Sequence, residues 1–119
     1  MRSMPRSRWC NYGGRKVVEG IDFHRTRREI IRWNLLRALD YARPEGTTEL
    51  VLLLTIQGLY ADATQREIRR ELDYLADRAL LNIDGRHTGN WHASLARHGV
   101  DIVEYAVECQ PGIARPPKV

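Results

Sequence analysis

The sequence has few cysteines and no hydrophobic run long enough to cross a membrane. Its two cysteines, Cys10 and Cys109, stand near opposite ends of 119 residues, a pattern typical of a reduced intracellular chain rather than of a disulfide framework. The longest apolar run, residues 50–54, is far shorter than the roughly 18 residues that a membrane span needs. Residues 1–12 are basic and polar and lack the apolar core of a secretion signal. We therefore expect a cytoplasmic protein with no membrane partner.

Recognisable catalytic motifs are also absent. The sequence contains no Gly-rich phosphate loop, no nucleophile elbow and no convincing pair of carboxylates. Its four histidines, His24, His87, His92 and His98, lack metal-ligand spacing with one another and with either cysteine. We therefore expect a protein that is not an enzyme and that needs no metal or other cofactor. The length is sufficient for one compact domain.

Basic residues are unevenly distributed along the chain. Residues 1–28 contain eight basic and two acidic side chains, whereas residues 29–119 contain 11 basic and 13 acidic ones, so the formal charge of +4 comes from the first part. Residues 1–20 show no helical or strand periodicity, and we expect a flexible basic arm there. Two interpretations of this arm stay open: a tail that follows phosphates or enters a minor groove, or an unstructured start without a role.

A first helix is expected over residues 26–42. Thr26-Arg27-Arg28-Glu29 fits the capping box, in which the threonine and the glutamate side chains satisfy each other's backbone N–H groups. The core-facing stripe of this helix consists of Ile31, Leu35, Ala38, Leu39 and Ala42. Three further side chains lie on a second face: Ile30, Trp33 and Arg37. This face predicts a partner interface, that of a homodimer above all, unless the arm covers it or Trp33 packs against its own wing or C-terminal helix.

The next segment, residues 49–59, is apolar on nearly every side, so periodicity does not distinguish a buried helix from a buried strand. We expect a helix, because Thr47 and Thr48 can cap it and because leucine favours helix over strand. A short strand over residues 47–49 remains open, and it would join the wing described below.

The helix that opens at Thr64 has the strongest local pattern. Thr64-Gln65-Arg66-Glu67 fits a second capping box, and apolar residues then recur at the spacing of one buried stripe. That stripe consists of Ile68, Leu72, Leu75, Ala76 and Ala79. The opposite face is basic in its first turns and acidic in its last turns, which suits a helix that enters the major groove with its N-terminus first. Glu67, Glu71 and Tyr74 are expected on an exposed flank of this face.

Four side chains of this helix are candidate DNA contacts: Gln65, Arg66, Arg69 and Arg70. Arg66 or Arg70 could bind a guanine edge and Gln65 an adenine edge, with about 1–3 kcal/mol of discrimination for a bidentate contact. A solvated, self-paired face explains the same residues, since Asp73 lies three residues after Arg70 and four after Arg69.

Two strands are expected next, over residues 80–84 and 90–95, joined by the Gly-containing loop 85–89. Alternation places Leu81 and Ile83 on one face, and it places Trp91, Ala93 and Leu95 opposite them. Arg86 and His87 lie at the tip of this predicted wing, where they would touch the minor groove or the backbone of DNA. A charged tip is equally typical of any solvated hairpin.

A final helix over residues 96–107 and an extended tail over residues 109–119 complete the expected organisation. The order of elements over residues 21–108 is that of a winged helix-turn-helix domain. It predicts an α+β fold, mainly α, with a three-helix core, a two-stranded wing and a C-terminal helix.

Residues 69–83 and 95–103 resemble the recognition helix, wing and closing helix of winged-helix regulators such as the ArsR and MarR groups. More narrowly, residues 21–117, which include the tail Pro-Gly-Ile-Ala-Arg-Pro, are similar to small winged-helix proteins of Mu-like phages and prophages. Ala79 departs from the pattern, which has a left-handed glycine there, and Ala96 replaces the usual capping Thr or Ser. The cysteine motif of arsenic-type sensors is absent, so the resemblance does not imply metal sensing.

Two functional hypotheses follow. The first is a dimeric, cytoplasmic protein of phage or prophage origin that binds double-stranded DNA in a bacterial host and regulates transcription. It would use the basic turns of the helix that opens at Thr64, with the wing and arm on phosphates. The second is a winged helix that does not bind DNA and serves as an interaction module for a phage protein in assembly or DNA packaging. The salt dependence of DNA binding distinguishes them.

Overall fold

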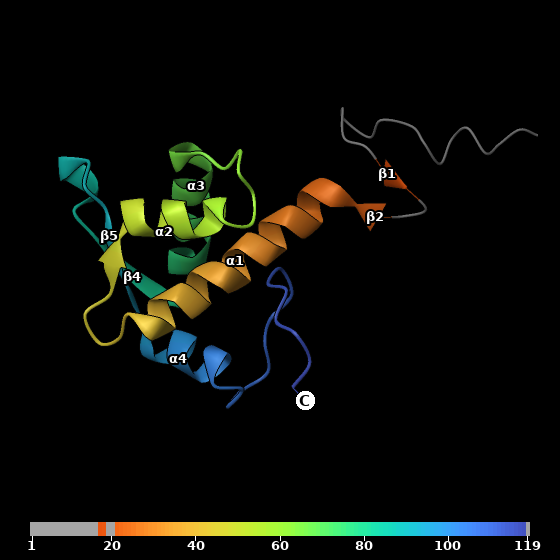
Figure 1. Cartoon of the computed structure of the whole chain (residues 1–119). Coiled ribbons are helices and arrows are strands. Elements are labelled where there is room, and N and C mark those ends of the chain that lie inside the picture. The colour runs from red at the N-terminus through yellow and green to blue at the C-terminus, as the bar shows by residue number, and fades with distance from the viewer. Residues whose placement is uncertain (1–16, 19–20, 119) are drawn as a thin grey trace, which may run out of the picture.

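The computed structural model describes residues 17–18 and 21–118, so most of the expected arm, residues 1–20, lies outside the described part. A long helix, α1 (Phe23–Tyr41), runs diagonally through the molecule, as Figure 1 shows. Three shorter helices pack around it: α2 (Glu49–Gln57), α3 (Gln65–Asp77) and α4 (Arg97–Val103). Two short strands, β1 (Val17–Val18) and β2 (Ile21–Asp22), precede α1 and pair with each other.

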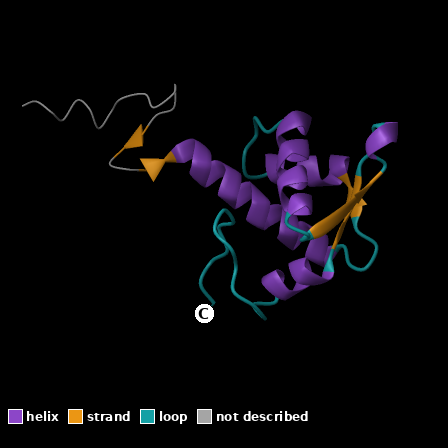
Figure 2. Cartoon of the chain, turned by 180° about the vertical axis from the view of Figure 1, so that it is seen from behind, coloured by secondary structure: helices purple, strands orange, loops and turns teal. Residues whose placement is uncertain are grey.

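A three-stranded antiparallel sheet lies beside the helices (Figure 2). Its order is β3 (Thr47–Thr48), β5 (His92–Leu95) and β4 (Leu81–Asp84). The predicted hairpin is present as β4 and β5, with strands slightly shorter than residues 80–84 and 90–95, and Leu81 pairs with Leu95 and Ile83 with Ala93. The third strand, which the sequence left open, is present as β3. The described residues thus form an α+β fold that is mainly helical.

The core is built from branched aliphatic side chains of all four helices and of β4. Its fully buried members are Ile31, Leu35, Leu36, Leu39, Leu52, Ile56, Ile68, Leu72, Leu75, Leu80, Leu81 and Ile102. The predicted stripes of α1 and α3 supply half of these residues, because their spacing brings them to one side of each helix. Ala79 is an exception: it is exposed and lies beyond the end of α3.

The start of α1 differs from the prediction by one turn. The helix begins at Phe23, and its cap is Asp22, whose carboxylate accepts hydrogen bonds from the backbone N–H groups of His24 at 3.1 Å and Arg25 at 3.2 Å. The predicted cap at Thr26 is therefore wrong. Glu29 does not complete a capping box but forms an ion pair with Arg25, 3.1 Å away and one turn earlier.

The other helices form where the sequence predicts them, with different ends. Helix α2 ends at Gln57 rather than at residue 59, and its N-cap Thr48 makes no side-chain capping bond. The Thr64 hydroxyl caps α3 as predicted, since it accepts the N–H of Glu67 at 3.2 Å. The carboxylate of Glu67, however, binds Arg27 of α1 with two bonds of 2.9 Å instead of returning to the cap.

Both α3 and α4 end in a left-handed residue that is not glycine. Ala79 has φ 61°, and its N–H bonds to Ala76 while the next N–H bonds to Leu75, which closes the helix in a Schellman motif. Tyr105, also with φ 61°, ends α4 in the same way, so this helix stops several residues before the predicted end at residue 107.

Residues 109–118 form no helix or strand, as expected, but they pack against the domain. Ile113 is buried with 8% of its surface exposed, and the N–H of Ala114 bonds to the carbonyl of Glu29 in α1 at 3.2 Å. Arg115 donates to the carbonyls of Ile102 and Val107, both at 3.0 Å. This segment therefore belongs to the folded unit. Within the described ranges, no helix is long and apolar enough to span a bilayer.

Candidate nucleic-acid interface

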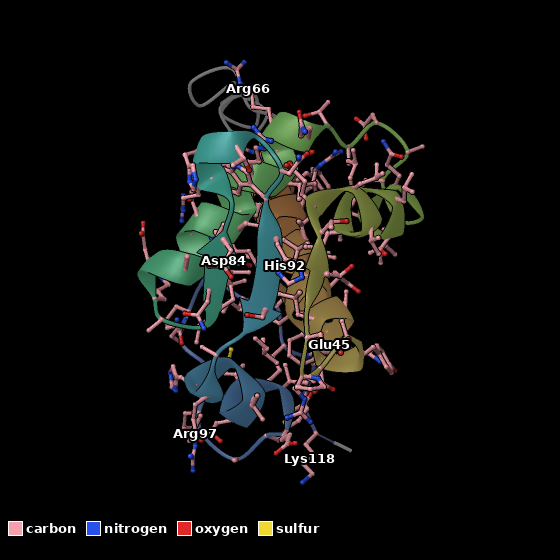
Figure 3. All side chains as sticks on the ribbon, turned by 90° about the vertical axis from the view of Figure 1, so that its left-hand side faces the viewer. Glu45, Arg66, Asp84, His92, Arg97 and Lys118 are labelled. Carbon is pink, nitrogen blue, oxygen red and sulfur yellow. The ribbon has the colours of Figure 1, made fainter. Side chains whose placement is uncertain are left out.

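The first turns of α3 present three of the predicted DNA contacts to solvent: Gln65, Arg66 and Arg70. Figure 3 shows Arg66 at one extremity of the molecule, with its side chain directed away from the domain. Arg66 makes no ion pair with any of the described residues. Arg70 has 61% of its side chain exposed and makes a 3.3 Å contact with Glu71. These side chains are close to the positive end of the helix dipole, which favours an anionic partner.

Arg69, the fourth predicted contact on α3, is engaged inside the protein. Its guanidinium donates to both carboxylate oxygens of Glu49, at 2.7 and 2.6 Å, and to the carbonyl of Gly89 at 2.8 Å. It also lies 4.9 Å from the centre of the Trp91 ring. Arg69 thus joins the start of α2 to the β4–β5 hairpin, the predicted wing, and in this geometry its donors are bound within the protein.

Glu49 completes this junction. It is only 7% exposed, and it accepts the backbone N–H of Trp91 at 3.1 Å in addition to the two bonds from Arg69. The hydrogen bonds from Arg69 hold the pKa of Glu49 below its ordinary value, although burial acts in the opposite direction. The same pairing raises the pKa of Arg69. The sequence pattern marks Glu49 only as the first residue of a helix and does not indicate this role.

The wing is attached to α3 by a second arginine. Arg86, predicted to contact DNA at the wing tip, forms an ion pair with Asp73 of α3 and lies 4.9 Å from the centre of the Trp91 ring. The predicted pairing of Asp73 with residues of its own helix is thus replaced by a contact with the wing. His87 is exposed on the short helical turn η2 (Arg86–Thr88), between Gly85 and Gly89, which both have positive φ.

The flank of α3 that was expected to be exposed faces α1. Glu71 is fully buried and accepts a 2.7 Å bond from Arg32, which also donates to the carbonyl of Gly112 at 2.9 Å. The ring of Tyr74 lies 3.5 Å from the Arg32 guanidinium. The exposed placement of Glu71 and its neighbours is therefore wrong. Two basic residues of α1, Arg27 and Arg32, make this packing possible by neutralising two glutamates of α3.

The predicted partner face on α1 is mostly covered by the chain itself. Trp33 is 7% exposed, and its ring packs edge-to-face with Tyr105 after α4, at a centroid distance of 6.2 Å. Assigning Trp33 to a partner interface is therefore wrong, and packing near the C-terminal helix, the stated alternative, is what occurs. Ile30 is half-buried, whereas Arg37 is exposed and donates to the hydroxyl of Tyr41 at 3.0 Å.

An exposed apolar surface occurs instead on α2, where the sequence suggested burial on all sides. We call it the α2 face and define it by Tyr41, Leu50, Val51 and Leu54, which are 79, 60, 49 and 59% exposed. The exposure of one side of this helix could have been expected, because a helix of nine residues at the surface of a small domain cannot bury every side.

The described part of the chain carries no net charge. Residues 17–18 and 21–118 contain 14 Lys or Arg and 14 Asp or Glu, and five further basic residues fall within residues 1–16. In the described ranges, no three His, Cys, Asp or Glu side chains are grouped closely enough to hold a metal ion. Comparisons of the chain with protein-family models, with curated proteins and with solved structures gave no match.

Proposed function

We propose that this chain is a winged helix-turn-helix protein that binds double-stranded DNA through the N-terminal turns of α3. The element order α1, β3, α2, α3, β4 and β5 supports this, because it places the capped helix directly after a helix and a turn and directly before a hairpin. The observation that carries the proposal is the exposure of Gln65, Arg66 and Arg70 at one end of α3. The resemblance to winged-helix proteins of phages and prophages is consistent with a regulator of that origin.

Each exposed residue has a distinct role in this proposal. Arg66 and Arg70 supply forked donors for the O6 and N7 of guanine, and Gln65 supplies the paired donor and acceptor that match adenine. His87 lies on the wing, where it reaches the backbone beside the helix. Arg69 and Arg86 hold the wing against α3 and so position the reading residues without touching DNA.

Because the described part is electrically neutral, the attraction to phosphates must come from elsewhere. Residues 1–16 contain five basic side chains, and phosphate neutralisation provides most of the non-specific affinity of DNA-binding proteins. In this proposal the arm supplies affinity and α3 supplies sequence discrimination. The two contributions are separable, since only the first falls steeply with salt.

The test is fluorescence anisotropy with the full chain and a pool of mixed duplexes, at low and at physiological salt. Arg66→Ala should weaken binding to selected duplexes about tenfold or more, which corresponds to the roughly 1–3 kcal/mol of a specific contact. Arg97→Ala is the matched control, because Arg97, like Arg66, is an exposed arginine in the first turn of a helix but lies at the opposite end of the molecule (Figure 3). It should leave the affinity almost unchanged.

Equal effects of the two substitutions, or no binding of any duplex at low salt, would contradict the proposal. The second result would favour the other candidate function, an interaction module for a phage protein in assembly or DNA packaging. The exposed apolar residues of the α2 face are the observation that supports this alternative.

A further inference from the structure

The α2 face gathers four of the large hydrophobic residues that the described part of the chain exposes. Leu50 and Leu54 are one helical turn apart, Val51 lies between them, and Tyr41 projects from the C-terminal end of α1. Each of these side chains leaves about half or more of its surface in water. Isolated exposed hydrophobic residues are normal, but a contiguous group of four on one face indicates an interaction site.

A hollow adjoins these projecting side chains. It lies between α1 and α2, has a volume of about 320 Å³, and is lined by Ala38, Tyr41, Ala42, Thr47, Val51 and Thr55. Four of the six lining residues are alanine or threonine, so the floor is made of small side chains. The same surface therefore offers protruding leucines and, beside them, a depression that can receive aliphatic groups.

This surface presents no charge from α2. The only charged residue of that helix, Glu49, is turned inward and held by Arg69 with bonds of 2.7 and 2.6 Å. Arg37, next to the face, has its guanidinium over the ring of Tyr41 at 5.8 Å and bonded to the hydroxyl. Two such surfaces can therefore approach each other without placing buried like charges together.

We propose that the α2 face pairs two copies of this chain in a two-fold symmetric dimer. An isologous interface requires one patch to be complementary to itself, and the leucines beside the hollow meet that requirement. The four side chains expose on the order of 500 Å² per copy, within the range of about 300–600 Å² for the largest patch of a monomer, which is often functional. Two patches together would bury about 1,000 Å², the lower limit that a biological interface is expected to reach.

The pairing leaves the reading helix uncovered. In Figure 1 α2 passes in front of α3, and the two helices pack against each other. The side chains that they expose belong to different helices: Leu50, Val51 and Leu54 lie on α2, and Gln65, Arg66 and Arg70 lie on α3. The dimer therefore does not depend on DNA binding. The experiment that tests the dimer is carried out without DNA, and a negative result would not contradict the proposed DNA binding.

The test is the molar mass of the full chain by light scattering during size exclusion, over concentrations up to about 100 μM. The unaltered chain should reach twice its 13.8 kDa as the concentration rises. Leu54→Glu places a charge at the centre of the α2 face and should raise the dimer Kd by at least about tenfold. Leu54→Gln, a milder change, should act in the same direction if the glutamate variant unfolds.

Phe23→Glu is the matched control, since Phe23 is 53% exposed and lies at the other end of α1, 18 residues from Tyr41 or about 27 Å along the axis. It should leave the dimer intact. Amide hydrogen exchange of the unaltered chain adds a readout without substitution: exchange in α2 should slow with concentration and exchange in α4 should not. A chain that stays monomeric at about 100 μM, or a dimer weakened equally by the Phe23 variant, would overturn the inference.

Discussion

The substitution Glu49→Gln tests how much the contact between α2, α3 and the β4–β5 hairpin contributes to the free energy of unfolding. The Glu49 carboxylate receives three hydrogen bonds, two from Arg69 and one from the backbone of Trp91, and its side chain is 8% exposed. Glutamine has nearly the same size but no charge, and it has only one acceptor oxygen. The substitution thus removes the ion pair and leaves the packing of the aliphatic stem in place.

The expected loss follows from the burial of the two partners. Removing one member of a fully buried ion pair costs about 3–5 kcal/mol, because the other charge is left without a partner. Arg69 retains 30% exposure and can turn partly into water, and the glutamine introduced by the substitution can still accept one bond. We therefore expect the free energy of unfolding to fall by about 2 kcal/mol, which is below that range.

The effect should depend on pH in a defined direction. Because hydrogen bonds from Arg69 lower the pKa of Glu49 in the folded chain, the unfolded chain binds a proton at that site more readily than the folded one. The stabilisation is therefore fully present above the ordinary glutamate pKa of about 4.3 and is lost as the pH falls through the lower value of the folded state. The difference in stability between the two proteins should shrink between about pH 5 and pH 3.

The measurement is urea unfolding followed by circular dichroism at several pH values. Glu45→Gln is the matched control, because Glu45 is exposed in the turn between α1 and β3 (Figure 3), and its change should stay within about 0.5 kcal/mol. If Glu49→Gln also changes stability by less than that, or if its effect is the same at acidic and neutral pH, the reasoning about the buried pair is refuted.

Three further substitutions test the packing, each by urea unfolding. Ala79→Gly should stabilise the protein by about 0.5–1 kcal/mol, because glycine adopts φ 61° without the steric cost that alanine bears, whereas Ala76→Gly inside α3 should destabilise it. Gly99→Ala should cost about 1–3 kcal/mol, since its Cβ would press against the backbone carbonyl of Leu80; a neutral result would contradict the close approach of α4 to β4. Ile113→Ala should cost about 2 kcal/mol if residues 109–118 are part of the folded unit, and no loss would indicate a dispensable tail.

Local sequence patterns predicted the elements whose stabilising contacts are made between residues close together in the sequence. The Thr64 hydroxyl caps α3 because the donor it satisfies is only three residues away, and the apolar stripe of that helix follows from its own periodicity. The register of the hairpin follows from alternation across a short loop. The resemblance to winged-helix proteins implied a left-handed glycine at position 79 and put the helix end in doubt because alanine stands there; Ala79 nevertheless adopts φ 61°.

The misplaced residues are those whose partners are distant in sequence. Glu71 was expected in water because a charged residue on a helix is normally solvated, but Arg32, 39 residues earlier, neutralises it in the interior. The same holds for Glu67, which Arg27 of α1, 40 residues earlier, neutralises. Trp33 was expected on a partner because it lies on a second apolar face of its helix, and Tyr105 supplies the contact from beyond α4.

The ion pairs around α3 determine which arginines near this helix remain free to contact an anionic partner. Asp73 holds Arg86, and Glu49 holds Arg69. Both pairs fix the wing beside the helix, so their charges are already neutralised and add little to a long-range field. Arg66 is left as a basic side chain of this helix with no acidic partner among the described residues. If the proposed DNA binding holds, such a surface is rigid but weakly attractive, and the proposal therefore assigns affinity to the basic residues 1–16 and selectivity to a few contacts at the start of α3.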